Sequence, residues 1–150
     1  MLKYLIMAAT LLGLESCATV DQALAPQPGL DTISITAGPH YGASRQVSEL
    51  MISSDGRVRF QGRRSSEVKS LIVGQEGYQG VAAALASYRL PNAIPACSEW
   101  MTHADSYTIV WTDPTGASTT LEHYAGAMCP ESQELTRILM TIPTMLGVAD

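Results

Sequence analysis

Residues 47–62 read VSELMISSDGRVRFQG, and this stretch decides the fold class. Two runs of strand-forming residues flank Asp55-Gly56, a dipeptide typical of the turn in a β-hairpin. In the second run Val58 and Phe60 alternate with charged and polar residues, so one side of the strand is expected to be buried. The stretch therefore predicts a sheet built from hairpins.

Four further runs have the composition of strands. Thr32–Thr36 alternates cleanly, and Val68–Val73 alternates less cleanly. Tyr107–Thr112 and Ser118–Tyr124 flank the turn-forming residues Asp113–Gly116, which predicts a second hairpin. Together with the first hairpin, these runs give six strands.

Two segments have helical spacing instead. The first is Gln75–Tyr88, which Pro91 follows, and the second starts at Pro130 and is expected to end or kink at Pro143. Their apolar stripes comprise Tyr78, Val81, Ala82, Leu85 and Tyr88 in the first and Leu135, Ile138, Leu139 and Ile142 in the second. The order β-β-β-β-α-β-β-α predicts an α+β fold, in which a mostly antiparallel sheet packs against two helices.

The first 16 residues have the composition of a signal peptide. One positive charge precedes an apolar run from Tyr4 to Leu14. At 1.5 Å per residue such a run is too short to cross a hydrocarbon core of about 30 Å. We therefore expect export of the chain and removal of residues 1–16.

Cys17 follows this leader in the setting of a lipoprotein signal. Leu14 and Ser16 match the residues expected before an acylated cysteine, while Glu15 departs from the small or uncharged residue that is usual there. Acyl chains such as palmitate on Cys17 would tether the protein to a membrane. Because Ala18 stands where aspartate tends to retain lipoproteins at the inner membrane, we expect an outer-membrane lipoprotein facing the periplasm.

The mature chain divides into a tether and one domain. Residues 17–30 carry two prolines and a glycine and have no sustained periodicity, which is typical of an extended linker. Residues 31–150 are expected to form a single globular α+β domain. The whole chain has 150 residues, of which 46% are hydrophobic and 15% charged, as in ordinary globular proteins.

The charges of the chain indicate which kinds of partner it is expected to bind. A formal net charge of −5 argues against a nucleic-acid binder, because phosphate contacts require a basic surface. The bases nevertheless cluster at Arg57, Arg59, Arg63 and Arg64. This cluster is interpreted either as a solvated strand face or as part of a binding surface.

Cys97 and Cys129 remain after Cys17 is set aside. In the oxidising periplasm two remaining cysteines predict a disulfide. The alternative is a redox-active or metal-binding pair, although the Cys-x-x-Cys spacing of such pairs is absent.

Several segments together resemble a family of exported bacterial proteins, many of them small lipoproteins, that is defined as a domain of unknown function. The resemblance covers residues 31–146. Its motifs are Thr32–Ile35, Gly38-Pro39, Ser54–Arg57 with Phe60–Arg64, Ala84–Arg89 and Tyr107–Asp113. It implies an exported domain, and a bonded Cys97 and Cys129 pair also fits it, but it implies no activity.

The chain departs from this family after the first strand. Similar proteins often carry a Cys-Phe-Gly-x-Cys-Pro turn, whereas residues His40 to Arg45 stand there in this sequence. Both cysteines are missing together, which suggests that they form a dispensable disulfide with each other rather than a catalytic site.

The candidates for chemistry are scattered. His103, Asp105 and His123, with Ser98, form a hypothetical metal site or catalytic set. No metal-ligand or nucleophile motif supports that hypothesis, so we expect no metal, no cofactor and no enzymatic activity.

The two tryptophans are interpreted differently. Trp111 belongs to the buried side of its strand, whereas Trp100 lies in the irregular stretch beside Cys97 and is either a binding anchor or a lid over the core. The sequence therefore predicts a non-enzymatic binding module with an envelope protein or cell-wall partner. The alternatives are an inhibitor of a periplasmic hydrolase and, third, an enzyme using His103, Asp105 and His123.

Overall fold

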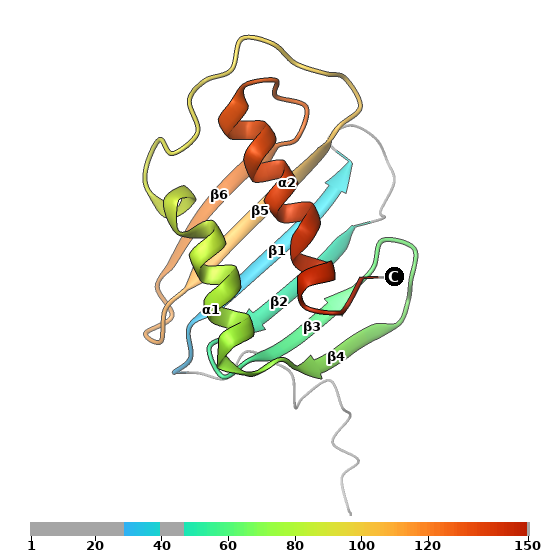
Figure 1. Cartoon of the computed structure of the whole chain (residues 1–150), viewed down its shortest axis with the longest axis vertical. Coiled ribbons are helices and arrows are strands. Elements are labelled where there is room, and N and C mark those ends of the chain that lie inside the picture. Colours follow the sequence, from blue (N-terminus) through green and yellow to red (C-terminus); the bar gives the residue numbers. More distant parts are fainter. Residues whose placement is uncertain (1–28, 40–46, 150) are drawn as a thin grey trace, which may run out of the picture.

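The computed structural model describes residues 29–39 and 47–149. Its sheet has six antiparallel strands in the order β4-β3-β2-β1-β5-β6 (Figure 1). The strands are β1 (Thr32–Pro39), β2 (Ser48–Ser53), β3 (Arg57–Gln61), β4 (Val68–Ile72), β5 (Asp105–Thr112) and β6 (Ser118–Tyr124), and the helices are α1 (Gly74–Leu85), the short 3₁₀ helix η2 (Ala86–Arg89) and α2 (Pro130–Met145). The predicted α+β class and the order of elements are confirmed. Cys17 and the His40 to Arg45 segment lie outside the described residues.

Both expected hairpins are present, and local chemistry explains their turns. In the β2–β3 turn Gly56 has a φ of +82°, and a Cβ there would lie 2.3 Å from the carbonyl oxygen of Gly74, so only glycine fits without strain. In the β5–β6 turn the Asp113 carboxylate accepts hydrogen bonds from the backbone N–H groups of Thr115 and Ala117.

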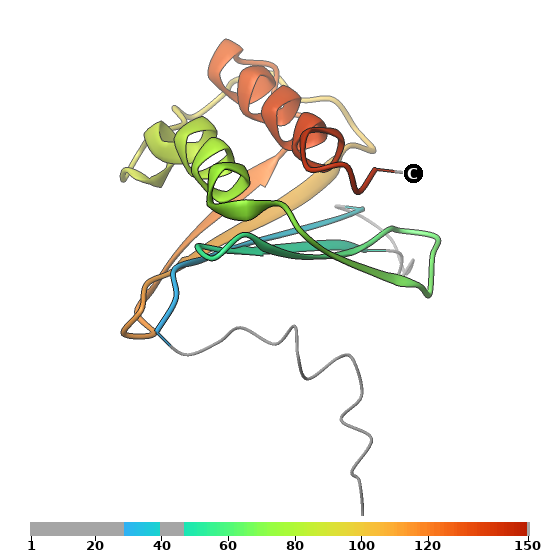
Figure 2. The same cartoon turned by 60° about the horizontal axis from the view of Figure 1, so that its bottom comes forward.

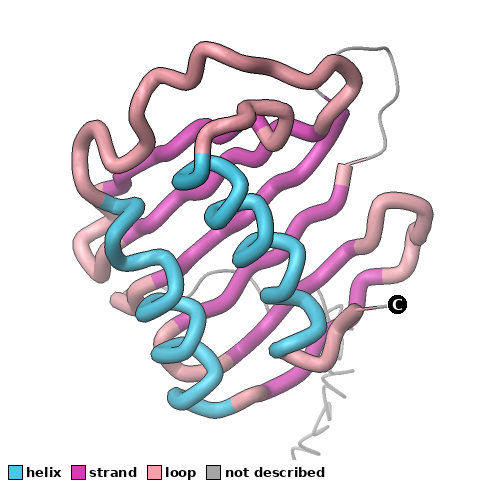
Figure 3. The backbone as a smooth tube through the Cα atoms, turned by 45° about the horizontal axis from the view of Figure 1, so that its top comes forward, coloured by secondary structure: helices cyan, strands magenta, loops and turns pink. Residues whose placement is uncertain are grey.

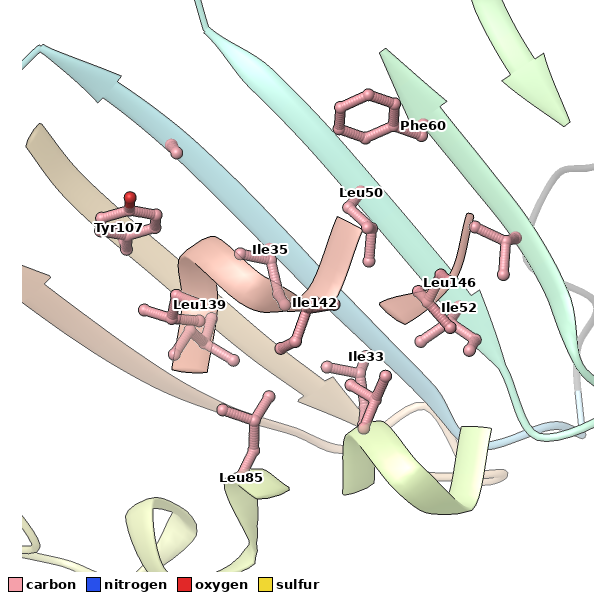
Figure 4. Packing of buried hydrophobic residues seen from close by; sticks show 14 of the residues in the cluster. Ile33, Ile35, Leu50, Ile52, Phe60, Leu85, Tyr107, Leu139, Ile142 and Leu146 are labelled. Atoms are coloured by element: carbon pink, nitrogen blue, oxygen red, sulfur yellow. The ribbon is translucent and has the colours of Figure 1, made fainter. Parts of the chain in front are cut away.

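The core lies between one face of the sheet and the two helices. Alternate residues of the strands point toward the helices, as Val58 and Phe60 were expected to do. Figure 4 shows these residues meeting the helix side chains; the labelled ones are Ile33, Ile35, Leu50, Ile52, Phe60, Leu85, Tyr107, Leu139, Ile142 and Leu146. Each large aliphatic side chain that is fully buried contributes about 1.5–3 kcal/mol to folding.

The second helix does not end at Pro143. It continues to Met145, with Pro143 inside its last turn. The missing N–H of this proline removes one hydrogen bond, but the backbone N–H of Leu146 still donates to the carbonyl of Ile142 at 3.0 Å. The chain then folds back so that Val148 is fully buried, and Lys69 Nζ donates to the Val148 carbonyl at 3.4 Å.

The first helical segment also differs in detail from expectation. Its α-helix ends at Leu85 and residues 86–89 form the 3₁₀ helix, so the expected single helix to Tyr88 is divided. Val81 and Leu85 of the expected stripe are buried, and its other members pack partly against the core.

The helices cover only one face of the sheet (Figure 2). The uncovered face carries alternate, mainly polar residues, among them Ser34, Thr36, Arg59 and Thr108. The long loop between η2 and β5 passes the N-terminal end of α2 before it reaches β5 (Figure 3). Within the described ranges, no helix has both the length and the apolar character that a membrane span requires.

Candidate functional site: the stapled loop beside β6

A disulfide attaches the long loop to the start of α2. Cys97 and Cys129 are bonded, with their Cα atoms 5.4 Å apart, which confirms the predicted pair. Cys129 is the residue immediately before Pro130, the first residue of α2. The middle of the loop is therefore fixed to a rigid element, the start of α2.

Backbone hydrogen bonds hold the next residues of the loop. The N–H of Met101 donates to the carbonyl of Gly126 at 2.7 Å, and the N–H of Met128 donates to the carbonyl of Glu99 at 2.9 Å. A Cβ on Gly126 would lie 2.5 Å from the carbonyl oxygen of Met101, so glycine permits this close approach. The two segments thus form a short two-stranded ribbon around the bridge between Trp100 and Ala127.

Trp100 is 60% exposed and lies on the face of this ribbon that it shares with Ala127. Its ring centroid is 5.8 Å from that of Tyr124, and the Tyr124 hydroxyl donates to the Met101 carbonyl at 2.6 Å. Met101 and Met128 are also exposed, but successive residues of a strand point to opposite faces, so they lie on the face of the ribbon opposite Trp100. We call the three exposed side chains of Trp100, Met101 and Met128, which together cover both faces of the ribbon, the Trp100 patch. Since Trp100 is exposed, it is not a lid over the core; Trp111, by contrast, is buried in the core as predicted.

A pocket of about 390 Å³ lies behind the patch. Residues 92–97 of the loop line one side of it, and Leu121–Tyr124 of β6 line the other, with Trp100 and Ala127 also contributing. A second hollow of about 370 Å³ shares Glu122, His123 and Tyr124 with the first. The end of β6 therefore lines both the pocket and the second hollow.

Ser132 lines the first pocket from the first turn of α2. The residue is 0% exposed, and its Oγ has no hydrogen-bond partner in the described part of the protein. A buried hydroxyl without a partner costs about 1–3 kcal/mol, so native proteins retain few such groups. Because Ser132 is 0% exposed, a ligand in the pocket would reach its hydroxyl only after the side chains that cover it shift.

His123 is 4% exposed and faces the helices rather than solvent. Its Nε2 lies 2.8 Å from Thr136 Oγ1, whose own hydrogen is donated to the Ser132 carbonyl, so Nε2 carries the proton and donates. The ring also stacks on Tyr107. Burial lowers the pKa of His123 below 6.5, which favours the neutral imidazole.

The other members of the hypothetical catalytic or metal set have separate surroundings. Asp105 pairs with Arg63 at 2.5 Å, and this carboxylate raises the pKa of the arginine. His103 and Ser98 are exposed on the loop, and His103 has a φ of +66°. Over residues 29–39 and 47–149, no group of three or more potential metal ligands comes together.

The arginine cluster does not join the Trp100 patch. Arg57 pairs with Asp55 at 3.1 Å, and Arg59 lies on the uncovered face of β3. Arg64 is exposed in the β3–β4 loop. Strands β2, β1, β5 and β6 separate Arg59 on β3 from the patch. Arg63 is the exception, because its partner Asp105 is the first residue of β5 and bonds Ala125 next to the ribbon.

Sequence reasoning found Trp100 but missed Met101, Met128, Glu122 and Ser132. Met101 follows Trp100 and Met128 precedes Cys129, and their place on one ribbon is visible only once the pairing of the two segments is known. The chain matches no known family model and no curated protein. The resemblance to exported proteins of unknown function therefore stays a prediction.

Proposed function

We propose that this protein is a lipid-anchored envelope protein that faces the periplasm and acts as a non-enzymatic binding module. The observation that carries the proposal is the exposed Trp100 patch on a loop stapled by the Cys97–Cys129 bond. Exposed tryptophan is the residue most enriched at the centres of protein interfaces.

The support for binding is energetic as well as compositional. The disulfide, the two backbone bonds of the ribbon and the Tyr124 hydroxyl already order the loop. A partner therefore loses little affinity to ordering this surface, which is the usual cost of binding through a loop. The exposed methionines on the other face of the ribbon add adaptable apolar area.

Inhibition of a periplasmic hydrolase is the second candidate for the same patch. A stapled loop with an exposed aromatic side chain has the rigidity that suits insertion into an enzyme cleft. The two candidates differ in their partner, since only an inhibitor would be captured on a hydrolase.

Site-specific photocrosslinking in intact cells tests both candidates, the binding module and the hydrolase inhibitor. A photoreactive amino acid at Met101 is expected to form a defined protein adduct, whereas the same group at Met140, an exposed apolar residue on α2, is not. Equal labelling at both positions, or none at Met101, would refute a specific role for the patch.

The anchor has its own test. Replacing Cys17 with serine is expected to abolish acylation and release the protein from the membrane fraction, since no other residue offers a thiol at this position. Mass spectrometry of the mature N-terminus measures the outcome. An unacylated N-terminus in the wild type contradicts the lipoprotein assignment.

A further inference from the structure

The two edges of the sheet are unequally protected. At the β4 edge Lys69 points toward the helix side and donates to the Val148 carbonyl, and an inward-pointing charge on an edge strand hinders pairing with another chain. Strand β6 reads STTLEHY, without proline or lysine, and pairs with β5 without a bulge. Strand β6 therefore lacks these devices within its own sequence, although η2 and loop residues 92–97 lie close to it.

The hydrogen-bond pattern identifies which groups of β6 face outward. The Ala125 N–H donates to Asp105 and the Asp113 N–H to Ala117, and these bonds lie at the two ends of the β5–β6 pairing. In an antiparallel pair, the hydrogen-bonded positions alternate along each strand. The N–H and C=O groups of Thr120 and Glu122 consequently point away from β5.

One of these two residues, Glu122, lies beside an empty space, and Thr120 is two residues away along the same edge. Glu122 lines the 390 Å³ pocket, and loop residues 92–97 line its other side, so the pocket flanks the outer edge of β6. Neighbouring strands lie about 4.8 Å apart, and side chains of an added strand alternate between its two faces. Ile94, Leu121 and Ala127 provide an apolar wall for one of these side chains.

The Ser132 hydroxyl is an independent sign of a ligand. It is completely buried, has no partner among the described residues and lines this same pocket. If the side chains that cover it shift on binding, a polar group of a bound segment would satisfy it and remove the cost of an unpaired hydroxyl.

Building on the proposed function, we propose that an extended polypeptide segment of a partner protein binds by adding a strand to the outer edge of β6, beneath loop residues 92–97. Its backbone bonds Thr120 and Glu122, one apolar side chain enters the pocket, and its neighbours contact the Trp100 patch at the rim. The exposed carboxylate of Glu122 and the net charge of −5 favour a segment with a basic residue opposite Glu122.

A second copy of the chain suits this edge less well. It would bring an equal negative charge, and its own loop residues 92–97 would approach the same edge. A single strand from a basic partner avoids both conflicts.

The test uses a displayed library of random linear peptides, selected on the purified protein with its disulfide intact. The selected peptides are then measured against Thr120→Pro, which removes the outward N–H, and against Thr120→Val, which keeps it. We expect Thr120→Pro to weaken binding by about tenfold or more, because one peptide carbonyl is left unpaired, and Thr120→Val to change it little. Proline is tolerated at an outward-facing edge position, and circular dichroism checks that both variants fold.

Trp100→Ala separates this inference from the proposed function. Peptides that lose affinity for Thr120→Pro and Trp100→Ala support both. If the peptides lose affinity for Trp100→Ala but not for Thr120→Pro, the Trp100 patch is supported and strand addition is overturned. If they lose affinity for Thr120→Pro but not for Trp100→Ala, strand addition is supported and the role of the patch is overturned. Failure to select any peptide, or self-association that Thr120→Pro abolishes, overturns a partner segment as the occupant.

Discussion

Removing the Cys97–Cys129 bond is expected to destabilise the domain by an amount that follows from its position. The bond joins residues separated by 32 in sequence, and closing a loop of that length contributes about 3.7 kcal/mol on the chain-entropy model. With a urea dependence of about 1.5 kcal/mol per molar for a domain of this size, the midpoint of unfolding should fall by about 2 to 3 M.

The assay compares a variant carrying both Cys97→Ala and Cys129→Ala with the parent, each in a Cys17→Ser background so that no third thiol takes part. Ser98→Ala, an exposed substitution next to the bond, is the matched control and should leave the midpoint unchanged. Urea unfolding followed by circular dichroism measures stability. A loss below about 1 kcal/mol in the double variant would refute the assignment of the disulfide as a main stabilising feature of the loop.

Three further outcomes are expected in the same assay. Ser132→Ala should raise the free energy of unfolding by about 1 kcal/mol, because it removes a buried hydroxyl that has no partner; a clear loss would contradict that state of Ser132. Gly126→Ala should lower the free energy of unfolding by more than about 2 kcal/mol, because the added Cβ would lie 2.5 Å from a carbonyl oxygen. Gly80→Ala on α1, where the nearest neighbour of a Cβ is at 3.9 Å, should raise it by about 0.5–1 kcal/mol. Equal effects of the two variants would argue against the ribbon. His123 has a folded-state pKa below 6.5, so the unfolded chain binds the proton first and stability should fall as the pH drops below 6.5, a loss that His123→Gln should reduce in a pH series.

The sheet was predictable because its signals are local. Asp55-Gly56 specifies its hairpin through a turn that needs a positive φ, and Val58 and Phe60 are buried as a period of two requires. The disulfide followed from the expected compartment rather than from any local pattern. These features need no knowledge of distant neighbours.

The errors in the helices arise from tertiary contacts. Of the two outcomes expected at Pro143, an end of α2 there is wrong: the chain stays helical for another two residues, and Leu146 and Val148 beyond them are buried on the core. Packing that buries apolar side chains outweighs the loss of one backbone bond at Pro143.

The candidate site was only partly predictable. Trp100 could be recognised from its setting beside Cys97, whereas the pocket depends on β6, the loop and α2 meeting in three dimensions. Ser132 has an ordinary sequence context, and only its burial without a partner distinguishes it. Pairings between residues far apart in sequence are not encoded in a local period.

The direction of β1 determines which end of the sheet lies near the Trp100 patch. This strand has 8 residues, so Thr32 and Pro39 are seven steps and about 24 Å apart. Pro39 pairs with Asp105, at the end of the sheet where the Trp100 loop enters β5. The membrane attachment that we propose ahead of Thr32 would therefore join the domain at the end of β1 opposite the Trp100 patch.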